Sequence, residues 1–167
     1  MYSRIVLLGF PGSGKTTIAK KLANRLQYQC IDLDLQFEQT YQMSIPDFFK
    51  KYGEEVFRKS EHLLLKEVLQ LNHVVISTGG GTPCFHGNME LILETSYSIY
   101  IKMSPVSLYD RLVNSKRIRP LVHNKTPDEI KQFVDTILPL REQYYLQADA
   151  VIKGESIDIE QLYQLLI

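Results

Sequence analysis

Residues 5–26 read IVLLGFPGSGKTTIAKKLANRL, and this stretch decides the fold. It begins with the apolar run 5–8, passes through the glycine-rich turn 9–14, and continues into 15–26, where apolar residues recur at the spacing of one helix face. A short apolar run predicts a buried strand, and the helical spacing predicts an amphipathic helix. The sequence therefore predicts a strand that leads directly into a helix, as in a parallel βα unit.

The turn between them fits the pattern G-x-x-x-x-G-K-[ST] from Gly9 to Thr16, which is a phosphate-binding loop, or P-loop. Its glycines let successive backbone N–H groups point inward, and the helix N-terminus adds a partial positive charge. We expect Lys15 to contact the terminal phosphates of a nucleotide and the Thr16 hydroxyl to bind Mg²⁺. The alternative, a glycine-rich turn that only ends a strand, is disfavoured because the strand and helix flank the motif as a P-loop requires.

The remaining chain repeats this alternation of short apolar runs and helical periods. Strands are predicted at residues 5–8, 30–33, 74–77, 99–102 and 150–152. Helices are predicted at residues 15–26, 53–70, 127–146 and 157–167. The polar, basic segment 114–125 is predicted to be a surface loop. The alternation predicts an α/β fold with one parallel sheet, and 167 residues suit a single domain.

The composition excludes several classes of protein. Nineteen Lys and Arg residues balance nineteen Asp and Glu residues, so no overall charge favours nucleic acid or an anionic membrane surface. No apolar run approaches the roughly 20 residues of a membrane span, and the first residues do not read as an export signal. Two cysteines cannot form a disulfide framework, and the four histidines lack metal-ligand spacing. We expect a cytoplasmic protein that binds neither nucleic acid nor membrane.

Kinases, GTP switches and motors share the P-loop, so the motif alone leaves the activity open. The segment closest to the guanine-reading N-K-x-D pattern is Asn124-Lys125-Thr126-Pro127, which lacks the Asp. This argues against a GTPase, and the chain is too short for the apparatus of a motor. Phosphoryl transfer to a small molecule is the favoured class, and the sequence should then contain an acceptor site.

Asp32 and Asp34 stand at the end of the second predicted strand. In an open parallel sheet the carboxyl ends of the strands face the same crevice as the P-loop. We expect Asp32 to lie near the hydrated Mg²⁺, and Asp34 to accept a hydrogen bond from the acceptor hydroxyl and to orient or deprotonate it. The alternative is a pair of surface aspartates in a turn.

Arginines supply candidate grips for an acceptor carboxylate. Arg58 and Glu61 are three residues apart and share a helix face, so the carboxylate can fix the guanidinium for two parallel hydrogen bonds to a ligand. Without the surrounding motifs, the spacing alone would favour a solvated salt bridge. Arg141, late in the helix 127–146, is either a second carboxylate grip or a surface cation.

Two loops complete the expected site. Gly79, Gly80 and Gly81 follow the strand 74–77 and let a ligand approach the main chain, unless they form only a flexible loop. The basic run 116–119 ends on Arg119, which would stabilise the transferring phosphoryl group if the loop closes as a lid. The alternative is a solvated basic loop.

Taken in order, these motifs resemble shikimate kinase from Ile5 to Ile152. Beyond the P-loop, the resemblance is carried by Asp32-Leu33-Asp34, Ser44-Ile45 with Phe49, Gly53-Glu54, Phe57-Arg58 with Glu61, Gly79-Gly80-Gly81, Arg119-Pro120-Leu121, and Arg141 with Tyr145. It implies a three-layer P-loop kinase fold of the nucleoside-monophosphate-kinase type, with a five-stranded parallel sheet in the order 2-3-1-4-5, helices on both faces and a lid loop. One domain over 1–167 is implied, with an acceptor-binding segment at about 34–61 and a lid at about 112–125.

The implied activity is ATP-dependent phosphorylation of the 3-hydroxyl of shikimate to shikimate 3-phosphate, a step of chorismate and aromatic amino acid biosynthesis. The ligands would be shikimate and ATP with Mg²⁺ as cofactor, and the protein is expected to be a monomer. Gluconate kinase or another small P-loop kinase is the enzyme alternative. A non-catalytic protein that binds nucleotide and regulates a partner is the alternative from another class.

The resemblance also implies roles for individual residues. The expected catalytic residues are Lys15, Asp34 and Arg119. The expected ATP-binding residues are Gly12, Ser13, Gly14, Lys15, Thr16, Thr17, Arg111 and Arg119, with Arg111 against the adenine. The expected acceptor-binding residues are Asp34, Arg58, Gly79, Gly80, Gly81 and Arg141. Ring-facing apolar residues would be Ile45, Phe49, Phe57, Pro120 and Leu121. The expected metal-site residues are Thr16 and Asp32.

Overall fold

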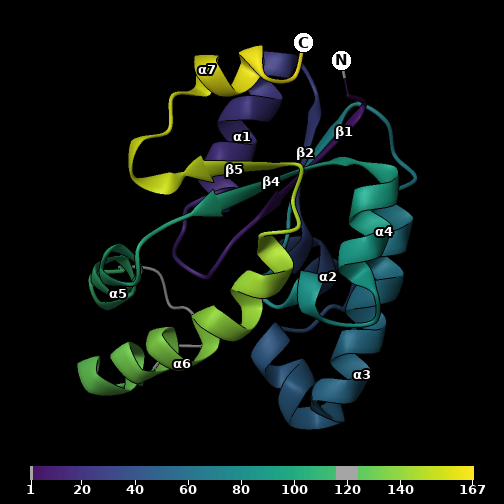
Figure 1. Ribbon diagram of the computed structural model, residues 1–167. Helices are drawn as coiled ribbons and strands as arrows, with labels where there is room; N and C mark the ends of the chain where they lie inside the picture. Colours follow the sequence, from purple (N-terminus) through teal and green to yellow (C-terminus); the bar gives the residue numbers. More distant parts are fainter. Residues whose placement is uncertain (1, 116–123) are drawn as a thin grey trace.

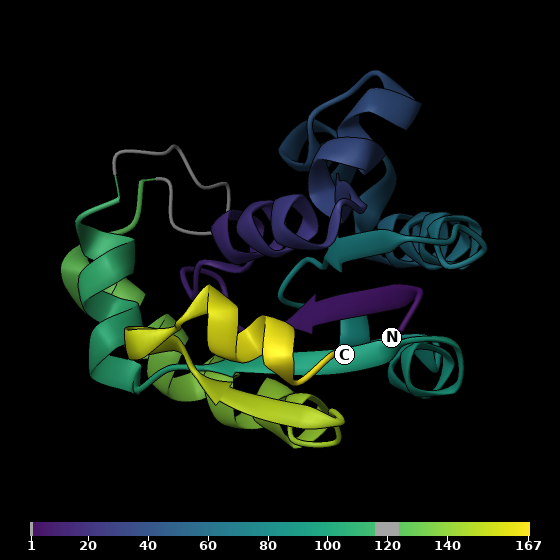
Figure 2. The same ribbon diagram turned by 90° about the horizontal axis from the view of Figure 1, so that it is seen from above.

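The described part of the chain forms one parallel sheet of five strands in the order β2-β3-β1-β4-β5. The structure, a computed structural model, describes residues 2–115 and 124–167. The strands are β1 (Arg4–Leu8), β2 (Gln29–Asp32), β3 (Val74–Ser77), β4 (Tyr97–Lys102) and β5 (Ala150–Lys153). Figure 2 shows β3, β1, β4 and β5 side by side in that order, and every neighbouring pair is parallel. The predicted fold class and strand order are confirmed.

Helices cover both faces of the sheet and make it the middle of three layers (Figure 1). Their bounds are α1 (Lys15–Leu26), α2 (Leu33–Tyr41), α3 (Ile45–Val68), α4 (Asn88–Thr95), α5 (Pro105–Val113), α6 (Pro127–Tyr145) and α7 (Ile159–Gln164). Two short 3-10 turns, η1 (Thr82–Cys84) and η2 (Gly154–Ser156), follow β3 and β5. None of the helices in the described ranges has the length and apolar character needed to cross a membrane.

Alternation along β1 divides the core in two. Ile5 and Leu7 pack with α1 and α7 on one face, whereas Val6 and Leu8 pack with residues of α2 to α6 on the other. All four side chains are fully buried. A parallel strand covered on both faces needs apolar residues at every position, which is why the segment reads as a continuous apolar run.

The second strand ends one residue earlier than predicted. Asp32 is the N-cap of α2: its Oδ1 accepts hydrogen bonds from the backbone N–H groups of Asp34 (3.1 Å) and Leu35 (3.2 Å). Such a cap satisfies backbone donors that the helix leaves unpaired. Leu33 therefore begins α2, a helix that was not predicted, and Asp34 lies in its first turn rather than after a strand.

Other helix boundaries also differ from the prediction. Helix α3 begins at Ile45, but Gly53 (φ 79°, ψ 169°) is non-helical and divides it at a kink into two helical segments, so the second segment begins where the helix 53–70 was predicted to start. Helix α7 spans only Ile159–Gln164 of the predicted 157–167, while α6 begins at Pro127 as predicted. Helices α4 and α5 were not predicted. Residues 116–123 of the predicted loop and lid lie outside the described residues.

Candidate active site

The P-loop joins β1 to α1 at the carboxyl edge of the sheet. Gly14 is the N-cap of α1 with φ 88°, a left-handed conformation that glycine adopts without a steric penalty. Gly9 lies close to the neighbouring strand β4 and to the loop itself. A Cβ at this position would be 2.9 Å from the Ile101 carbonyl oxygen of β4 and 2.8 Å from Ser13 Oγ. The tight loop brings the N-terminus of α1 to the sheet edge, where it offers a binding site for an anion.

Lys15 folds back over the P-loop. Its ammonium donates hydrogen bonds to the carbonyl oxygens of Gly9 (2.8 Å) and Phe10 (3.1 Å), and the residue is buried. Arg111, from the last turn of α5, approaches the same loop with Nη1 3.4 Å from the carbonyl oxygens of Gly12 and Ser13. Two cations therefore flank the loop, and both favour bound phosphate.

Three oxygen-bearing side chains meet beside the P-loop. The Thr16 hydroxyl donates to Asp32 Oδ2 at 2.6 Å and lies 3.4 Å from the Ser77 hydroxyl. A carboxylate and hydroxyls are hard ligands of the kind that Mg²⁺ prefers. The predicted metal-site residues Thr16 and Asp32 thus adjoin each other. Ser77 was missed, although a polar residue at the end of the apolar run 74–77 was a usable signal.

Asp34 projects from the first turn of α2 toward the glycine loop. A Cβ on Gly79 would lie only 2.8 Å from Asp34 Oδ1. The crowding protein around the carboxyl raises the pKa of Asp34 to about 6; the negative charges of Glu61 and Asp32 add to this, while Lys15 opposes it. The residue still keeps an exposed surface, so the carboxyl borders a space that a ligand can enter. A carboxylate with this pKa is ionised at neutral pH and can still accept a proton readily.

Arg58 is held against the end of the glycine loop. Its Nη1 donates to Glu61 at 3.0 Å, and Glu61 also accepts from the Thr82 hydroxyl at 2.8 Å. Arg58 is 9% exposed and Glu61 2% exposed, so this is a buried ion pair and not the solvated salt bridge that the spacing alone allowed. Removing two charged groups from water costs free energy, and the hydrogen bond from the Thr82 hydroxyl to Glu61 offsets part of that cost.

Arg141 reaches the same loop from α6. Its Nη1 is buried and has no hydrogen-bond partner among the described residues. A Cβ on Gly80 would lie 3.1 Å from this nitrogen, and the Tyr145 hydroxyl donates to the Gly80 carbonyl oxygen. Buried guanidinium nitrogens are nearly always paired, so an unpaired one beside a glycine loop indicates the binding position of an anion.

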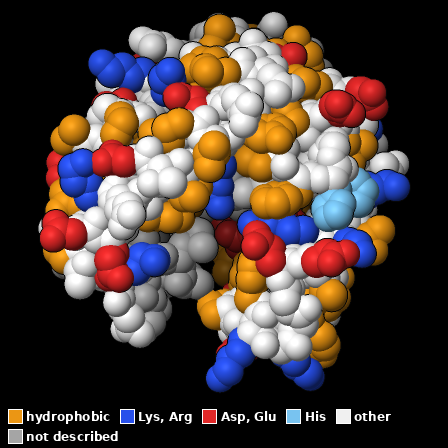
Figure 3. Space-filling view, turned by 60° about the horizontal axis from the view of Figure 1, so that its bottom comes forward, with side chains coloured by type: hydrophobic (Ala, Val, Ile, Leu, Met, Phe, Trp, Pro, Cys, Tyr) orange, Lys and Arg blue, Asp and Glu red, His pale blue; other side chains and the backbone are white. Residues whose placement is uncertain are grey.

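Figure 3 looks onto this face and shows a hollow with charged side chains of both signs around it. Among the predicted residues, Thr16 contacts Asp32, Asp34 adjoins Gly79, Arg58 adjoins Gly81 and Arg141 adjoins Gly80. Lys15 and Arg111 instead contact the main chain of the P-loop, at Gly9 and at Gly12 and Ser13. Thr17 lies on an exposed side of α1. The predicted lid residues Arg119, Pro120 and Leu121 lie outside the described residues.

Sequence reasoning assigned no role to Cys84, which follows the glycine loop in η1. Partial burial raises the pKa of its thiol to about 11, although the cations Arg141 and Arg58 oppose the shift. The thiol is therefore neutral at physiological pH and adds no negative charge beside the two arginines.

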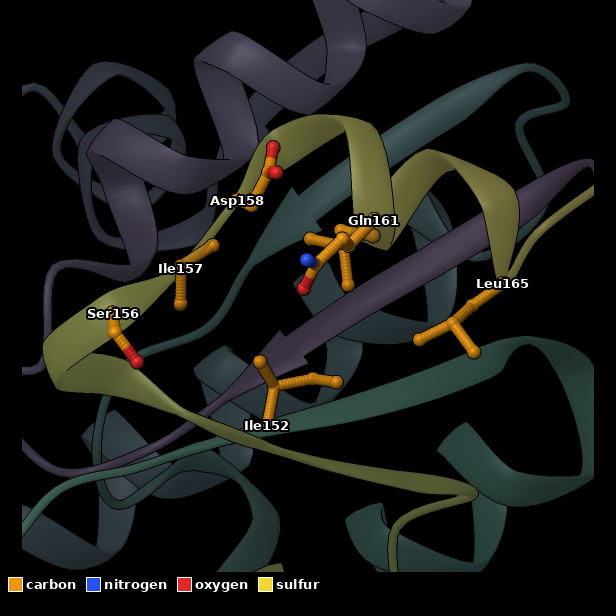
Figure 4. A pocket seen from close by; sticks show the side chains of 7 residues that line it. Ile152, Ser156, Ile157, Asp158, Gln161 and Leu165 are labelled. Carbon is orange, nitrogen blue, oxygen red and sulfur yellow. The ribbon is translucent and has the colours of Figure 1, made fainter.

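A separate hollow of about 220 Å³ lies between β5 and α7 (Figure 4). Its lining residues are Ile152, Ser156, Ile157, Asp158, Gln161, Leu162 and Leu165. The only charged side chain among them, Asp158, already accepts a hydrogen bond from the backbone N–H of Glu160 as the cap of α7. This hollow contains none of the predicted site residues, and the P-loop face is the better candidate for chemistry.

Comparisons with known proteins agree with this geometry. A family model described as shikimate kinase matches residues 11–167. The shikimate kinase of Azobacteroides pseudotrichonymphae is 46% identical over 149 residues, covering 89% of this chain and 88% of the relative. The shikimate kinase of Flavobacterium johnsoniae is 39% identical, covering 96% of this chain and 95% of the relative.

Solved structures give the same result. The crystal structure of shikimate kinase from Bacteroides thetaiotaomicron superposes with a TM-score of 0.95 at 34% identity, covering 99% of both chains. Shikimate kinase from Acinetobacter baumannii in complex with shikimate superposes with a TM-score of 0.84 at 28% identity, covering 98% of this chain and 90% of that one. The chain belongs to the shikimate kinase family.

Proposed function

We propose that this protein transfers the γ-phosphoryl group of ATP to the 3-hydroxyl of shikimate. The observation that carries the proposal is the convergence of Arg58 and Arg141 on the glycine loop that also borders Asp34. Two guanidinium groups suit the carboxylate of a small acid, and a carboxylate with a pKa of about 6 suits its reacting hydroxyl. The names of the relatives, and the shikimate complex of the Acinetobacter baumannii protein, support this acceptor.

In the acceptor half of the site, Arg58, Arg141 and the Gly80 main chain bind the shikimate carboxylate. The buried, unpaired Nη1 of Arg141 supplies one donor. Asp34 and the main chain near Gly79 and Gly81 meet the ring hydroxyls. Substrate held at both ends presents its 3-hydroxyl to the phosphate chain in one orientation, and such positioning accounts for much of the catalysis in phosphoryl transfer.

In the nucleotide half, the backbone N–H groups of residues 12–17 and the Lys15 ammonium bind the phosphates. Arg111 packs against the adenine end, as its approach to the P-loop allows. Arg119 acts from the lid on the transferring phosphoryl group. The positive charge of Lys15 and Arg119 stabilises the negative charge that spreads over the γ-phosphoryl oxygens.

Thr16 and Asp32 would hold the Mg²⁺ of the nucleotide, with Ser77 beside them. When bound, the ion neutralises phosphate charge during the transfer. Asp34 accepts the proton of the 3-hydroxyl while that oxygen bonds to the γ-phosphorus and ADP leaves. The bond from the shikimate oxygen to the γ-phosphorus forms as the bond from the γ-phosphorus to the β–γ bridging oxygen breaks. That bridging oxygen leaves with ADP, and the proton moves to Asp34 and then to solvent.

The chain is proposed to act as a monomer and a single cytoplasmic domain. Its acceptor-binding segment lies at about 34–61 and its lid at about 112–125. The one continuous sheet with a core on each face supports the single domain.

A coupled assay for ADP release tests the proposal with shikimate, gluconate and nucleoside monophosphates as acceptors in the presence of Mg²⁺ and ATP. Of these acceptors, only shikimate should stimulate ADP release. Stimulation by gluconate but not shikimate would assign the chain to the alternative sugar-acid kinase activity. Nucleotide binding without turnover on any acceptor would favour the non-catalytic regulator.

A further inference from the structure

The Arg58 guanidinium is restrained on its edges and on a face. Glu61 accepts from Nη1 at 3.0 Å and Glu54 accepts from Nε at 3.3 Å. The guanidinium carbon lies 4.2 Å from the centroid of the Phe85 ring, and the Phe57 ring is farther away at 5.1 Å. An aromatic ring presents its negative face to a cation at such distances and attracts it. The proposed acceptor site already gives Glu61 a role, that of holding Arg58, but it gives Phe85 none.

Phe85 is placed by the short connection between the glycine loop and α4. It follows η1 directly, and its carbonyl oxygen accepts a hydrogen bond from the Asn88 backbone N–H at 2.9 Å. The Asn88 side chain is fully buried and donates to the Thr82 carbonyl oxygen at 2.8 Å. These bonds tie both ends of the connection to Asn88, so the aromatic ring is carried by a fixed segment and not by a free loop.

The same asparagine joins this segment to the helix that carries Arg58. Asn88 Oδ1 lies 2.6 Å from His62 Nδ1, and His62 stands four residues after Arg58 in α3. Helix α3 and the Phe85 segment are therefore linked by a partly buried hydrogen bond. The ring and the guanidinium consequently keep a fixed relation even though Phe85 is 36% exposed at the surface and Arg58 only 9%.

We propose that Phe85 is a positioning residue of the acceptor site, which sets the plane of the Arg58 guanidinium through its ring face. The inference rests on the proposed function, in which Arg58 grips the acceptor carboxylate. Glu61 fixes one edge of the guanidinium, and Phe85 prevents rotation of the planar group away from the glycine loop. A planar donor group held in advance loses less rotational freedom when it pairs with a carboxylate, so binding is tighter.

The test compares three variants with the wild type in steady-state kinetics, varying shikimate and ATP separately. Phe85→Leu keeps an apolar side chain but removes the ring, and should raise the KM for shikimate about three- to thirtyfold. The KM for ATP and kcat should change less than about twofold, because Phe85 contacts neither the P-loop nor Asp34 in the proposed mechanism. Phe85→Tyr keeps the ring and should restore most of the affinity.

Tyr163→Leu is the matched control. The Arg25 guanidinium carbon lies 3.8 Å from the centroid of the Tyr163 ring, so the variant also removes an arginine–aromatic contact. That contact joins α7 to α1 and is outside the acceptor site. Both KM values of this variant should match those of the wild type, and thermal unfolding should show that all the variants remain folded at the assay temperature.

An unchanged KM for shikimate in Phe85→Leu would overturn the inference, and so would equal losses in Phe85→Leu and Phe85→Tyr. A parallel loss of kcat and of both affinities would instead indicate a general structural role and would also overturn it. Failure of the proposed function is recognised separately, in the wild type alone, as an absence of shikimate-dependent ADP release. That result would remove the basis of the inference before any variant is compared.

Discussion

The Arg58 guanidinium and the Gly81 main chain are in direct contact: a Cβ on residue 81 would lie 2.7 Å from Arg58 Nη2 and 2.9 Å from Nη1. No larger residue fits at position 81 unless the guanidinium moves. The absence of a side chain at residue 81 therefore leaves the space in which the Arg58 guanidinium lies at the acceptor site.

Gly81→Ala should displace Arg58 and raise the KM for shikimate at least about tenfold, the loss expected when a charge-assisted contact is misplaced. The end of a flexible side chain is what must move, so the fold should survive. Kinetics with each substrate varied, together with a thermal melt, check this. A normal KM for shikimate in a folded variant would refute the argument from contact.

Arg58→Ala should raise the KM for shikimate by about ten- to a hundredfold, because a hydrogen-bonded ion pair with the carboxylate is lost. The KM for ATP should stay near the wild-type value. Lys59→Ala is the control: Lys59 is the next residue of α3, and its ion pair with Glu55 at 2.7 Å is exposed to solvent. Equal losses for both substrates in Arg58→Ala would remove Arg58 from the acceptor site.

Asp34→Asn should lower kcat at least about a hundredfold while the fold persists, since an amide cannot accept the hydroxyl proton. In the wild type, kcat/KM for shikimate should fall as the pH drops through about 6, where Asp34 becomes protonated. A pH–rate series of the wild type and the variant measures both effects. A kcat that does not respond to the substitution would exclude Asp34 from the mechanism.

The Asp34→Asn substitution that lowers kcat should raise the thermal stability of the protein at neutral pH. The pKa of this carboxyl is raised from 3.8 to about 6 in the folded state, so its ionisation favours the unfolded chain. Its destabilising effect is absent below pH 3.8, grows as the pH rises to about 6, and is constant above that. Asp34→Asn should therefore melt at a higher temperature than the wild type at pH 7. Equal melting temperatures at pH 7 would contradict the raised pKa.

Thr16→Val should raise the Mg²⁺ concentration required for half-maximal activity at least about tenfold, because the hydroxyl beside Asp32 is removed without a change in volume. Thr16→Ser retains a hydroxyl and serves as the control. Chelation of Mg²⁺ should abolish activity in all three proteins. Titration of Mg²⁺ at fixed ATP separates the variants, and identical titration curves would place the ion elsewhere.

The sheet and the P-loop could be predicted from the sequence because each depends on local patterns. The run Ile5 to Leu8 is apolar on both faces, and the P-loop torsions require glycines at fixed spacing. The strand order came with the resemblance and not from these patterns. The structure confirms the strand order as well as the strand, turn and helix of the P-loop.

What the sequence did not predict depends on contacts between distant residues or on the ends of elements. Asp32 ends β2, but its carboxylate also caps α2, which places Asp34 in a helix that was not predicted. The Gly53 kink agrees with the predicted helix start at residue 53, but the helical segment that begins at Ile45 was not predicted. The contact of Phe85 with Arg58 joins residues 27 positions apart and has no local signature.

The most direct test of the account is a crystal structure with shikimate and a magnesium nucleotide bound. The shikimate carboxylate should lie within hydrogen-bond distance of the Arg58 and Arg141 guanidinium groups, beside Gly80, and the 3-hydroxyl should face Asp34. A carboxylate bound elsewhere, with Arg141 Nη1 still unpaired, would contradict the central claim.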